Sequence, residues 1–460
     1  MMINTRKNRV PMQEISAKER IKHFKEVPRG YTKKQAIQEA RRCLQCPDFP
    51  CSKNCPVHVD VRAFIKKLAA GKLKEAYLKI KEQNPIPAIT GRVCPQENHC
   101  EGACRLGKIG DPVNIGKLEA FLADWARGKN IKEEFKAKER EKKIAVIGSG
   151  PSGIGCAVDL RKRGYQVTVY EALHKAGGVL QYGIPEFRLP KKIVDKELAY
   201  LKNIGIKIKL NKIVGQNVSF QKLKNEYDSI FIGTGAGAPI FLGIDGEELN
   251  GFYSANEFLI RINLMKAYKF PEYDTPIKVG NRVGVIGAGN VAMDSARCAK
   301  RLGGDVYILY RRTRKEVSAR KEELIHALEE GINFVELVSP KKILGENGRV
   351  KGTELIKMEL GKLDKTGRPK PEEIKGSEFV MNFDTIVIAL GTKPNRLFLS
   401  QARGIKTTEQ NEIVVDKNLK TNITSVFAGG DVIGGRATVI QALGEGKKAA
   451  ISINEYLSEN

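Results

Sequence analysis

The sequence contains few aromatic residues and no long apolar run. Phe, Tyr and Trp make up 7% of the 460 residues, and only one of them is Trp. No segment approaches the roughly 20 consecutive apolar residues of a membrane-spanning helix. The opening stretch, MMINTRKNRVPMQEIS, contains no apolar core of a secretory signal. We therefore expect a cytoplasmic protein with no membrane partner.

Acidic residues are outnumbered by basic ones, and the formal net charge is +26. A basic chain can bind nucleic acid, but no RNA- or DNA-binding signature is present. The lysines are spread over segments such as KKLAAGKLKEA and KNIGIKIKLNK instead of forming one block. This spread favours a solvated, lysine-rich surface, with an acidic redox partner or polyanionic cofactors as the alternative. No nucleic-acid partner is expected.

Cysteine is scarce outside one region of the chain. Seven of the nine cysteines lie between Cys43 and Cys104. They form the runs C-x2-C-x4-C-x3-C-P and C-P-x4-C-x3-C. Without a secretory signal, such a cluster indicates metal binding before disulfides.

The first run resembles the bacterial ferredoxin pattern, in which the cysteine before proline serves a second cluster. That logic predicts two iron–sulfur clusters. The first has the ligands Cys43, Cys46, Cys51 and Cys104, and the second has Cys55, Cys94 and Cys100. Two four-ligand clusters need one ligand more than these cysteines supply. The alternative is a pair of zinc sites completed by His58 or His99.

A dinucleotide-binding unit begins at Lys142. Ile144 to Ile147 read as a buried strand, and the turn GSGPSG follows with the spacing G-x-G-x-x-G. Such glycines allow a tight turn and let the backbone and a helix N-terminus approach a pyrophosphate. A second strand, Val167 to Tyr170, leads to Glu171, where a carboxylate can hold ribose hydroxyls. The predicted ligand contacts of this loop are Gly148, Ser149, Gly150, Pro151, Ser152 and Gly153.

Three further segments contain small residues that let backbone approach a flat ring or a sugar chain. They are GGVLQYGIP, YDSIFIGTGAG and AGGD. A helix beginning near Thr438 would direct its N-terminus at a bound anion. The candidate flavin contacts in these segments are Gly178, Leu180, Gly235, Gly430, Asp431 and Thr438.

A second dinucleotide unit opens at Arg282 with the turn GAGNVA. Here no acid follows the second strand, and Arg311 and Arg312 stand in its place. A guanidinium can clamp a 2′-phosphate that an acid would repel, so this unit should prefer NADPH. Arg320 is a weaker third candidate. The predicted contacts are Gly287, Gly289, Asn290, Val291, Arg311 and Arg312. The first unit is then left with FAD.

These motifs predict an α/β protein in which an α-helical iron–sulfur domain precedes two Rossmann-like domains, an internal repeat of architecture. Residues 1–140 form the helical domain, with Thr32 as the N-cap of one helix and a charged linker helix over 132–143. Residues 141–255 and 395–460 bind FAD, and residues 256–394 form an inserted NADPH domain. The chain lacks a C-x4-C after the first unit and a C-x-x-C in the second. Flavin electrons therefore cannot leave through a redox-active disulfide.

Six motifs resemble the family of the small (β) subunit of NADPH-dependent glutamate synthase: CLQCPDFPCSKNCP, GRVCPQENHCEGAC, GSGPSG, GGVLQYGIP, GAGNVAMD and AGGD. Relatives include homotetrameric-type glutamate synthase, the flavoprotein subunit of electron-bifurcating NADH-dependent ferredoxin:NADP oxidoreductase, sulfide dehydrogenase and the N-terminal half of dihydropyrimidine dehydrogenase. The resemblance covers nearly the whole chain. It implies two [4Fe-4S] clusters, FAD and NADPH. It also implies Glu119 as the eighth cluster ligand.

The resemblance implies hydride transfer between NADPH and FAD, followed by one-electron transfer through the clusters, in support of glutamate synthesis from 2-oxoglutarate and glutamine. The cofactors carry this chemistry, so no catalytic side chain is named. The expected partner is a larger synthase subunit, a smaller flavin/[2Fe-2S] subunit or ferredoxin, in an oligomer. The alternatives are a ferredoxin:NADP oxidoreductase or sulfide dehydrogenase subunit and, without turnover, a nucleotide-binding redox sensor.

Overall fold

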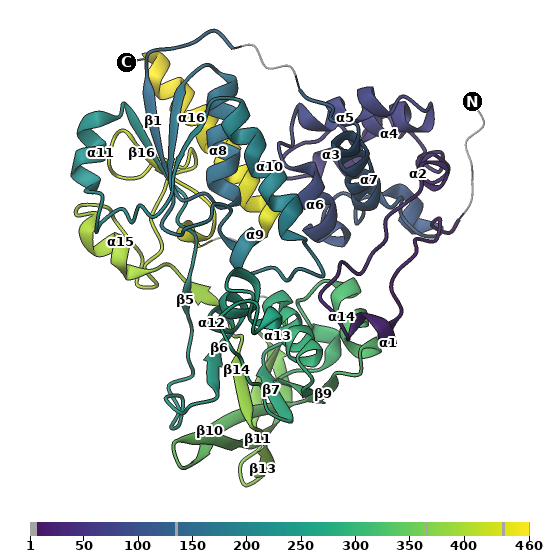
Figure 1. Cartoon of the computed structure of the whole chain (residues 1–460), viewed down its shortest axis with the longest axis vertical. Helices are drawn as coiled ribbons and strands as arrows, with labels where there is room; N and C mark the ends of the chain where they lie inside the picture. The colour runs from purple at the N-terminus through teal and green to yellow at the C-terminus, as the bar shows by residue number, and fades with distance from the viewer. Residues whose placement is uncertain (1–6, 134–136, 365–366, 435–437, 460) are drawn as a thin grey trace.

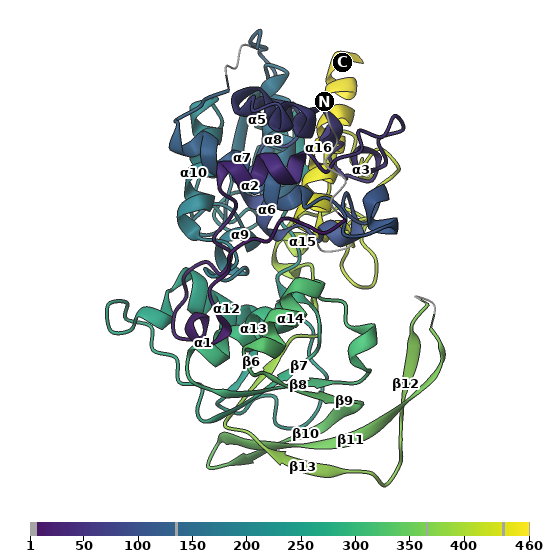
Figure 2. The same cartoon turned by 90° about the vertical axis from the view of Figure 1, so that its right-hand side faces the viewer.

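The computed structural model describes residues 7–133, 137–364, 367–434 and 438–459. It contains a helical part and two parts built on parallel sheets (Figure 1). The helical part lies beside the first sheet, and the second sheet lies below both in the views of Figures 1 and 2. The predicted α/β class, with helices preceding two Rossmann-like units, is confirmed.

The helical part consists of short helices joined by cysteine-bearing loops. Thr32 and Gln35 form a capping box at the start of the second helix, as expected for Thr32. The helices are α1 (Ala17–Arg20), α2 (Lys33–Ala40), α3 (Pro50–Lys53), α4 (Val61–Ala69), α5 (Leu73–Lys81), α6 (Pro87–Val93) and α7 (Ile115–Gly128), with the short 3-10 helices η1 (Gln96–Asn98) and η2 (Arg105–Lys108).

The charged segment 132–143 is not a helix in its described residues, so that prediction is wrong. Glu133 instead binds Lys162 and the Tyr200 hydroxyl, both at 2.6 Å, and Glu139 pairs with Arg161. The charges of this segment therefore pair with residues of neighbouring helices. In an isolated charged helix they could form only i,i+4 pairs.

The first sheet is parallel, with the strand order β16-β4-β1-β2-β3. Helices α8, α10 and α16 pack on one face together with the helical part, and α11 and α15 pack on the other. The strands are β1 (Lys143–Ile147), β2 (Gln166–Tyr170), β3 (Lys207–Lys209), β4 (Ser229–Ile232) and β16 (Val426–Ala428). The helices are α8 (Pro151–Lys162), α9 (Val179–Tyr182), α10 (Lys191–Asn203), α11 (Phe220–Glu226), α15 (Arg396–Gln401) and α16 (Val439–Glu459).

The C-terminal helix α16 lies directly against α8 (Figure 1). A Cβ added to Gly155 would clash with the Leu443 carbonyl, and one added to Gly446 would clash with the Ser152 carbonyl. These glycines let the two helices approach backbone to backbone. The end of the chain is thereby held at the first nucleotide turn.

The second sheet is also parallel, with the order β6-β14-β7-β8-β9. Its first strand, β6 (Phe252–Ser254), lies within residues that the sequence assigned to the FAD part. The other strands are β7 (Arg282–Ile286), β8 (Asp305–Tyr310), β9 (Asn333–Glu336) and β14 (Thr385–Ile388). The helices are α12 (Ala255–Leu259), α13 (Asn290–Arg301) and α14 (Lys321–Glu329), with the short helices η3 (Ile260–Leu264), η4 (Ala267–Lys269) and η5 (Arg314–Glu316).

Two smaller sheets complete the fold. Strands β5 (Ala238–Pro239) and β15 (Thr392–Lys393) pair where the chain passes between the two parallel sheets. An antiparallel sheet of β10 (Val338–Glu346), β11 (Arg349–Leu363), β12 (Pro369–Glu373) and β13 (Phe379–Asn382) extends from the second unit (Figure 2). The sequence analysis did not predict this antiparallel sheet.

Among the described helices, none combines the length and apolar character needed to cross a membrane.

Candidate functional site

Four cysteines of the helical part line one small cavity. Cys43 and Cys46 lie in the loop after α2, Cys51 lies in α3, and Cys104 precedes η2. Apolar residues form most of the remaining wall. Four thiols around one cavity are the donor set of a [4Fe-4S] cluster. The structure thus brings together the residues that the sequence assigned to the first cluster, and we call this the first cavity.

Cys55, Cys94, Cys100 and Glu119 line a second cavity. Asn84 and the Thr90 hydroxyl both donate to Glu119 Oε1, at 2.5 Å each. These bonds leave Oε2 as the candidate ligand atom. The second cavity therefore offers three thiols and one carboxylate, the donor count that a four-iron cluster requires.

Val61 and Ile115 line both cavities and form a thin apolar wall between them. Both side chains are almost fully buried, at 2% exposure each. Val61 begins α4 and Ile115 begins α7, so the starts of two packed helices fix the wall. Two clusters held here would be neighbours without sharing a ligand.

Burial raises the pKa of several cavity thiols. The pKa of Cys51 rises to about 11 through burial and the nearby Cys43 and Cys104. Burial raises the pKa of Cys94 and Cys100 well above the ordinary value, and Glu119 adds to the shift at Cys94 and Glu101 to that at Cys100. These thiols are neutral without a metal, and a bound cation reverses that balance because a coordinating thiol is deprotonated.

Two close approaches shape the first glycine turn. Gly148 has φ +101° and its amide binds the Tyr170 carbonyl at 2.8 Å. A Cβ on Gly153 would clash with the Gly148 carbonyl, whereas a Cβ on Gly150 would meet nothing within 4 Å. Gly150 caps α8, with Pro151 as its first helical residue and Ser152 behind it. The open space at Gly150, in front of a helix N-terminus, fits a pyrophosphate.

Glu171 is buried at the end of β2 and closes this turn. Its Oε2 accepts from the Ser149 amide at 3.1 Å and from the Ser149 hydroxyl, and its Oε1 accepts from the Leu173 amide at 2.8 Å. A carboxylate has about four lone-pair sites, so capacity for a ribose hydroxyl is left. The Ser149 hydroxyl also accepts from the Gly177 amide at 2.8 Å, which joins this turn to the next glycine segment.

Gly178 faces the first turn from the opposite side. It has φ +53°, and an added Cβ would lie 3.0 Å from the Gly150 Cα. Leu180 follows in α9 and is fully buried. Buried Lys191, which sequence reasoning missed, donates to the Leu180 carbonyl at 3.0 Å and to the Ile184 carbonyl. One lysine therefore fixes the segment predicted to lie against the flavin.

The candidate flavin contacts near the C-terminus meet the first turn through α16. An added Cβ on Gly430, which has φ +80°, would lie 2.7 Å from the Ser152 Oγ. Thr438 accepts from the Gln441 amide at 3.3 Å and caps α16. Burial, together with Glu445, raises the pKa of Asp431 to about 6. Gly235 has φ +69° and open space around it. Of these residues, Gly430 lies directly against the first turn, at Ser152.

The second glycine turn repeats the first. Gly287 has φ +119°, and an added Cβ would lie 2.5 Å from the Ala389 carbonyl. Gly289 caps α13, which begins at Asn290. Val291 is 41% exposed at the open end of this helix. This turn also fits a dinucleotide pyrophosphate.

The two arginines after β8 have different surroundings. Arg311 is exposed. Arg312 is 4% exposed, and it donates to the Pro369 carbonyl at 2.8 Å and to Asp364 at 2.9 Å. Partial desolvation of its guanidinium and the neighbouring Arg312 lower the pKa of Arg311, although the residue as a whole is exposed. Arg311 is therefore the better placed of the two for a 2′-phosphate, while Arg312 anchors the β11–β12 hairpin.

Arg320, the weaker candidate for the 2′-phosphate, is buried and directed elsewhere. Its side chain donates to the Arg92 carbonyl at 2.9 Å, to Gln96 Oε1 at 3.0 Å and to Glu322 at 2.8 Å. Its backbone amide donates to Asn290 Oδ1 at 3.0 Å. Arg320 therefore joins the second glycine turn to the loop between Cys94 and Cys100. No short sequence motif predicted this contact.

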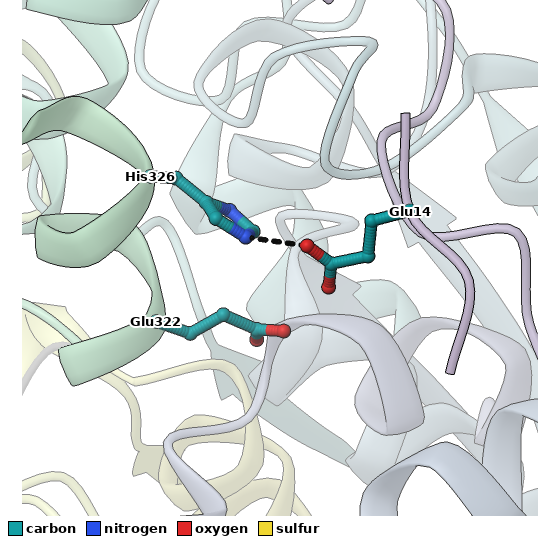
Figure 3. Close-up of side chains that lie close together, drawn as sticks. All are labelled: Glu14, Glu322 and His326. Atoms are coloured by element: carbon teal, nitrogen blue, oxygen red, sulfur yellow. Dashed lines mark hydrogen bonds and ion pairs between the residues drawn. The ribbon is translucent and has the colours of Figure 1, made fainter. Parts of the chain in front are cut away.

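Residues 7–32, which precede α2 and are called the N-terminal arm, are fastened to α14 by side-chain contacts (Figure 3). His326 Nε2 lies 3.0 Å from Glu14 Oε2, and Glu322 points to the same space. Lys117 and Arg320 bind Glu322 at 2.9 and 2.8 Å and hold its pKa near 2 despite burial. Because two cations already occupy this carboxylate, the arrangement fits an ion-pair clasp and not a cation site.

Two family models together match most of the chain. Residues 20–131 match the model described as dihydropyrimidine dehydrogenase domain II, 4Fe-4S cluster. Residues 134–446 match that of the pyridine nucleotide-disulphide oxidoreductases. The first match contains both cysteine cavities, and the second contains both glycine turns.

The chain is similar to subunits of several enzymes. It is 33% identical over 448 residues to the glutamate synthase [NADPH] small chain of Halomonas elongata, with 96% of this chain and 95% of that one covered. It is 36% identical over 436 residues to the β subunit of the NADP(+)-dependent formate dehydrogenase of Moorella thermoacetica, with 89% and 60% covered. The chain thus spans about 60% of the length of the Moorella subunit.

Solved structures show the same fold at low identity. FprA from Mycobacterium tuberculosis in complex with NADPH has a TM-score of 0.60 and 21% identity, covering 70% of this chain and 85% of its own. Thioredoxin reductase from T. acidophilum has a TM-score of 0.51 and 22% identity, covering 69% and 99%.

Two thiol-lined cavities beside two dinucleotide turns define an NADPH-dependent FAD oxidoreductase with [4Fe-4S] clusters. The chain belongs to the family of the glutamate synthase [NADPH] small chain. The predicted fold, cofactors and enzyme class are confirmed. The roles of the individual site residues stay predictions.

Proposed function

We propose that this chain is an electron-input subunit that oxidises NADPH and passes electrons singly to a larger synthase subunit, which makes glutamate from 2-oxoglutarate and glutamine. FAD and the clusters, when bound, would supply the hydride acceptor for NADPH and the carriers of single electrons. The chain itself binds and aligns these groups and keeps water from them.

The main support for the proposal is the order of the predicted sites: the predicted flavin contacts, then the second cavity, then the first cavity. Ile440, two residues after Thr438, lines the second cavity. An added Cβ on Gly444 would lie 2.6 Å from the Pro56 carbonyl, next to Cys55. The first turn of α16 thus separates the flavin contacts from the second cavity, and Val61 and Ile115 separate that cavity from the first.

The predicted site residues would have different binding roles. The turn from Gly148 to Gly153 would hold the FAD pyrophosphate, and Glu171 the adenosine ribose. Lys191 orients the segment facing the flavin. At the second turn, Gly287 and Gly289 would approach the NADPH pyrophosphate with Asn290 and Val291 beside them, and the Arg311 guanidinium would select the 2′-phosphate, with Arg312 in support.

Glu119 would complete the second cluster. Its carboxylate lines the second cavity together with Cys55, Cys94 and Cys100, and this shared cavity supports a position next to the three sulfurs. A carboxylate oxygen is a hard ligand among thiolates, and it supplies the charge that a fourth cysteine would bring.

A second acceptor is favoured by the pattern of relatives. The 36% identity to the formate dehydrogenase β subunit exceeds the 33% to the Halomonas small chain. The β subunit of the NADPH-Fe(3+) oxidoreductase of Geobacter sulfurreducens is 33% identical over 468 residues, with 95% of this chain and 68% of that one covered. The same line of sites would serve a ferredoxin:NADP oxidoreductase.

Affinity purification of the tagged full chain from its own cell separates these partners. The proposal expects a large synthase subunit to co-purify, with NADPH- and 2-oxoglutarate-dependent glutamate formation by the complex. Co-purification of a small flavin/[2Fe-2S] chain, with NADPH-dependent ferredoxin reduction and no glutamate formation, would contradict the proposal. It would support the second function instead.

A further inference from the structure

His99 places a buried, unpaired nitrogen at the second cavity. Its Nε2 is shielded from solvent and has no hydrogen-bond partner among the described residues. The residue lies directly before Cys100 and lines the cavity with the three cysteines and Glu119. Burying a polar group without a partner is unfavourable, so such a nitrogen indicates a missing partner.

The other polar side chains of this cavity are already engaged. Asn84 donates to Thr90 and Glu119. Gln96 donates to the Thr90 and Gly91 carbonyls at 3.4 and 3.3 Å and accepts from Arg320. Asn54 holds the His99 carbonyl at 2.8 Å and fixes the backbone that carries the ring.

We propose that His99 Nε2 donates a hydrogen bond to a sulfur of the second [4Fe-4S] cluster and thereby raises its reduction potential. The proposal rests on the assignment of a cluster to this cavity. Hydrogen bonds to cluster sulfurs stabilise the more negative, reduced state. His99 is a positioning residue here and not a ligand, because Glu119 already gives the three thiols of this cavity a fourth donor.

The potential of the second cluster tests this directly. His99→Leu in the full chain removes the donor and keeps an apolar filling of similar size. At a fixed potential near the midpoint, the ratio of reduced to oxidised second cluster should fall about tenfold, a shift of about 59 mV to lower potential. Iron content and the EPR signal of the first cluster should not change. His58→Asn is the control, since His58 is exposed and Asn tolerates its φ of +54°.

An unchanged potential with both clusters retained overturns the proposal. Loss of about four iron atoms in His99→Leu also overturns it, because His99 would then be a ligand. Pulsed EPR of the reduced wild-type protein, labelled with [15N]histidine, needs no variant. A weak nitrogen coupling supports the hydrogen bond, whereas a strong coupling or none contradicts it. If no iron–sulfur cluster occupies the cavity of the wild-type protein, it is the cofactor assignment that fails, and iron analysis detects this beforehand.

Discussion

Arg320 Nη2 lies 3.0 Å from Gln96 Oε1, which joins the second nucleotide unit to the loop that carries Cys94 and Cys100. The same residue's amide is held by Asn290 at the second glycine turn. The side chain is 5% exposed, so the contact is shielded from water. The second nucleotide unit is thus fastened to the second cavity through Arg320, and the Lys321 amide adds a bond to Glu97 Oε1 at 3.1 Å.

The 2′-phosphate assignment predicts different outcomes for two adjacent arginines. Arg311→Ala should weaken NADPH binding about 10- to 100-fold and leave NADH binding unchanged, because charged hydrogen bonds contribute about 1.5–3 kcal/mol. Arg312→Ala should mainly lower the melting temperature, since it releases Asp364 and the hairpin. Titration with both nucleotides measures this, and equal losses for NADPH and NADH in Arg311→Ala would refute the assignment.

Gly150→Ala should fold but purify without FAD. Its φ of −68° suits any residue, and the added methyl would meet only the space assigned to the pyrophosphate. Gly153→Ala is the matched contrast, since its methyl clashes with the Gly148 carbonyl and should reduce the yield of folded protein. Flavin absorbance and circular dichroism separate the two effects. A Gly150→Ala protein with full FAD content would rule out this pyrophosphate site.

Glu119→Ala should lose the second cluster alone. Removing the carboxylate leaves three thiols, so iron should fall from about eight to about four per chain. Cys104→Ser should remove the first cluster and leave the second. Iron analysis with EPR compares the pair, and retention of both clusters in Glu119→Ala would show that another group is the eighth ligand.

Arg20, Arg297 and Arg301 surround Glu330. We therefore expect acid to weaken the attachment of the N-terminal arm. Despite burial, Arg301 and Arg297 hold the pKa of Glu330 near 2, against 4.5 ordinarily, and Arg20 of α1 adds a bond at 2.8 Å. A lowered folded-state pKa stabilises the fold above about pH 4.5 and loses that contribution as pH falls towards 2.

Glu330→Gln should therefore cost about 3 kcal/mol of unfolding free energy at pH 7, and this difference from wild type should shrink below pH 4.5. Urea unfolding at several pH values measures it. Glu329→Gln is the control, because Glu329 is 51% exposed and pairs only with Arg20 among the described ion pairs. Glu329→Gln should lower the free energy of unfolding by less than about 1 kcal/mol. Equal effects of the two variants would contradict the stabilising role of the buried Glu330 ion pairs.

The local motifs predicted much of the fold. Strands β1 and β7, their glycine turns and the Thr32 cap are set by residues within a few positions of one another, and short-range periodicity contains that information. The split of the cysteines between two cavities followed from their spacing. Arg312 and Arg320 were different, because their partners Asp364 and Gln96 lie far away in the sequence. The segment 132–143 failed as a helix for the same reason.

Cofactor analysis of the full chain, purified without oxygen, tests the central claim most directly. The account predicts about eight iron atoms, about eight acid-labile sulfides and one FAD per chain, since each cluster contains four of each atom. Zinc without sulfide, or iron limited to about four atoms per chain with both cavities intact, would contradict the line of sites from NADPH to the first cavity.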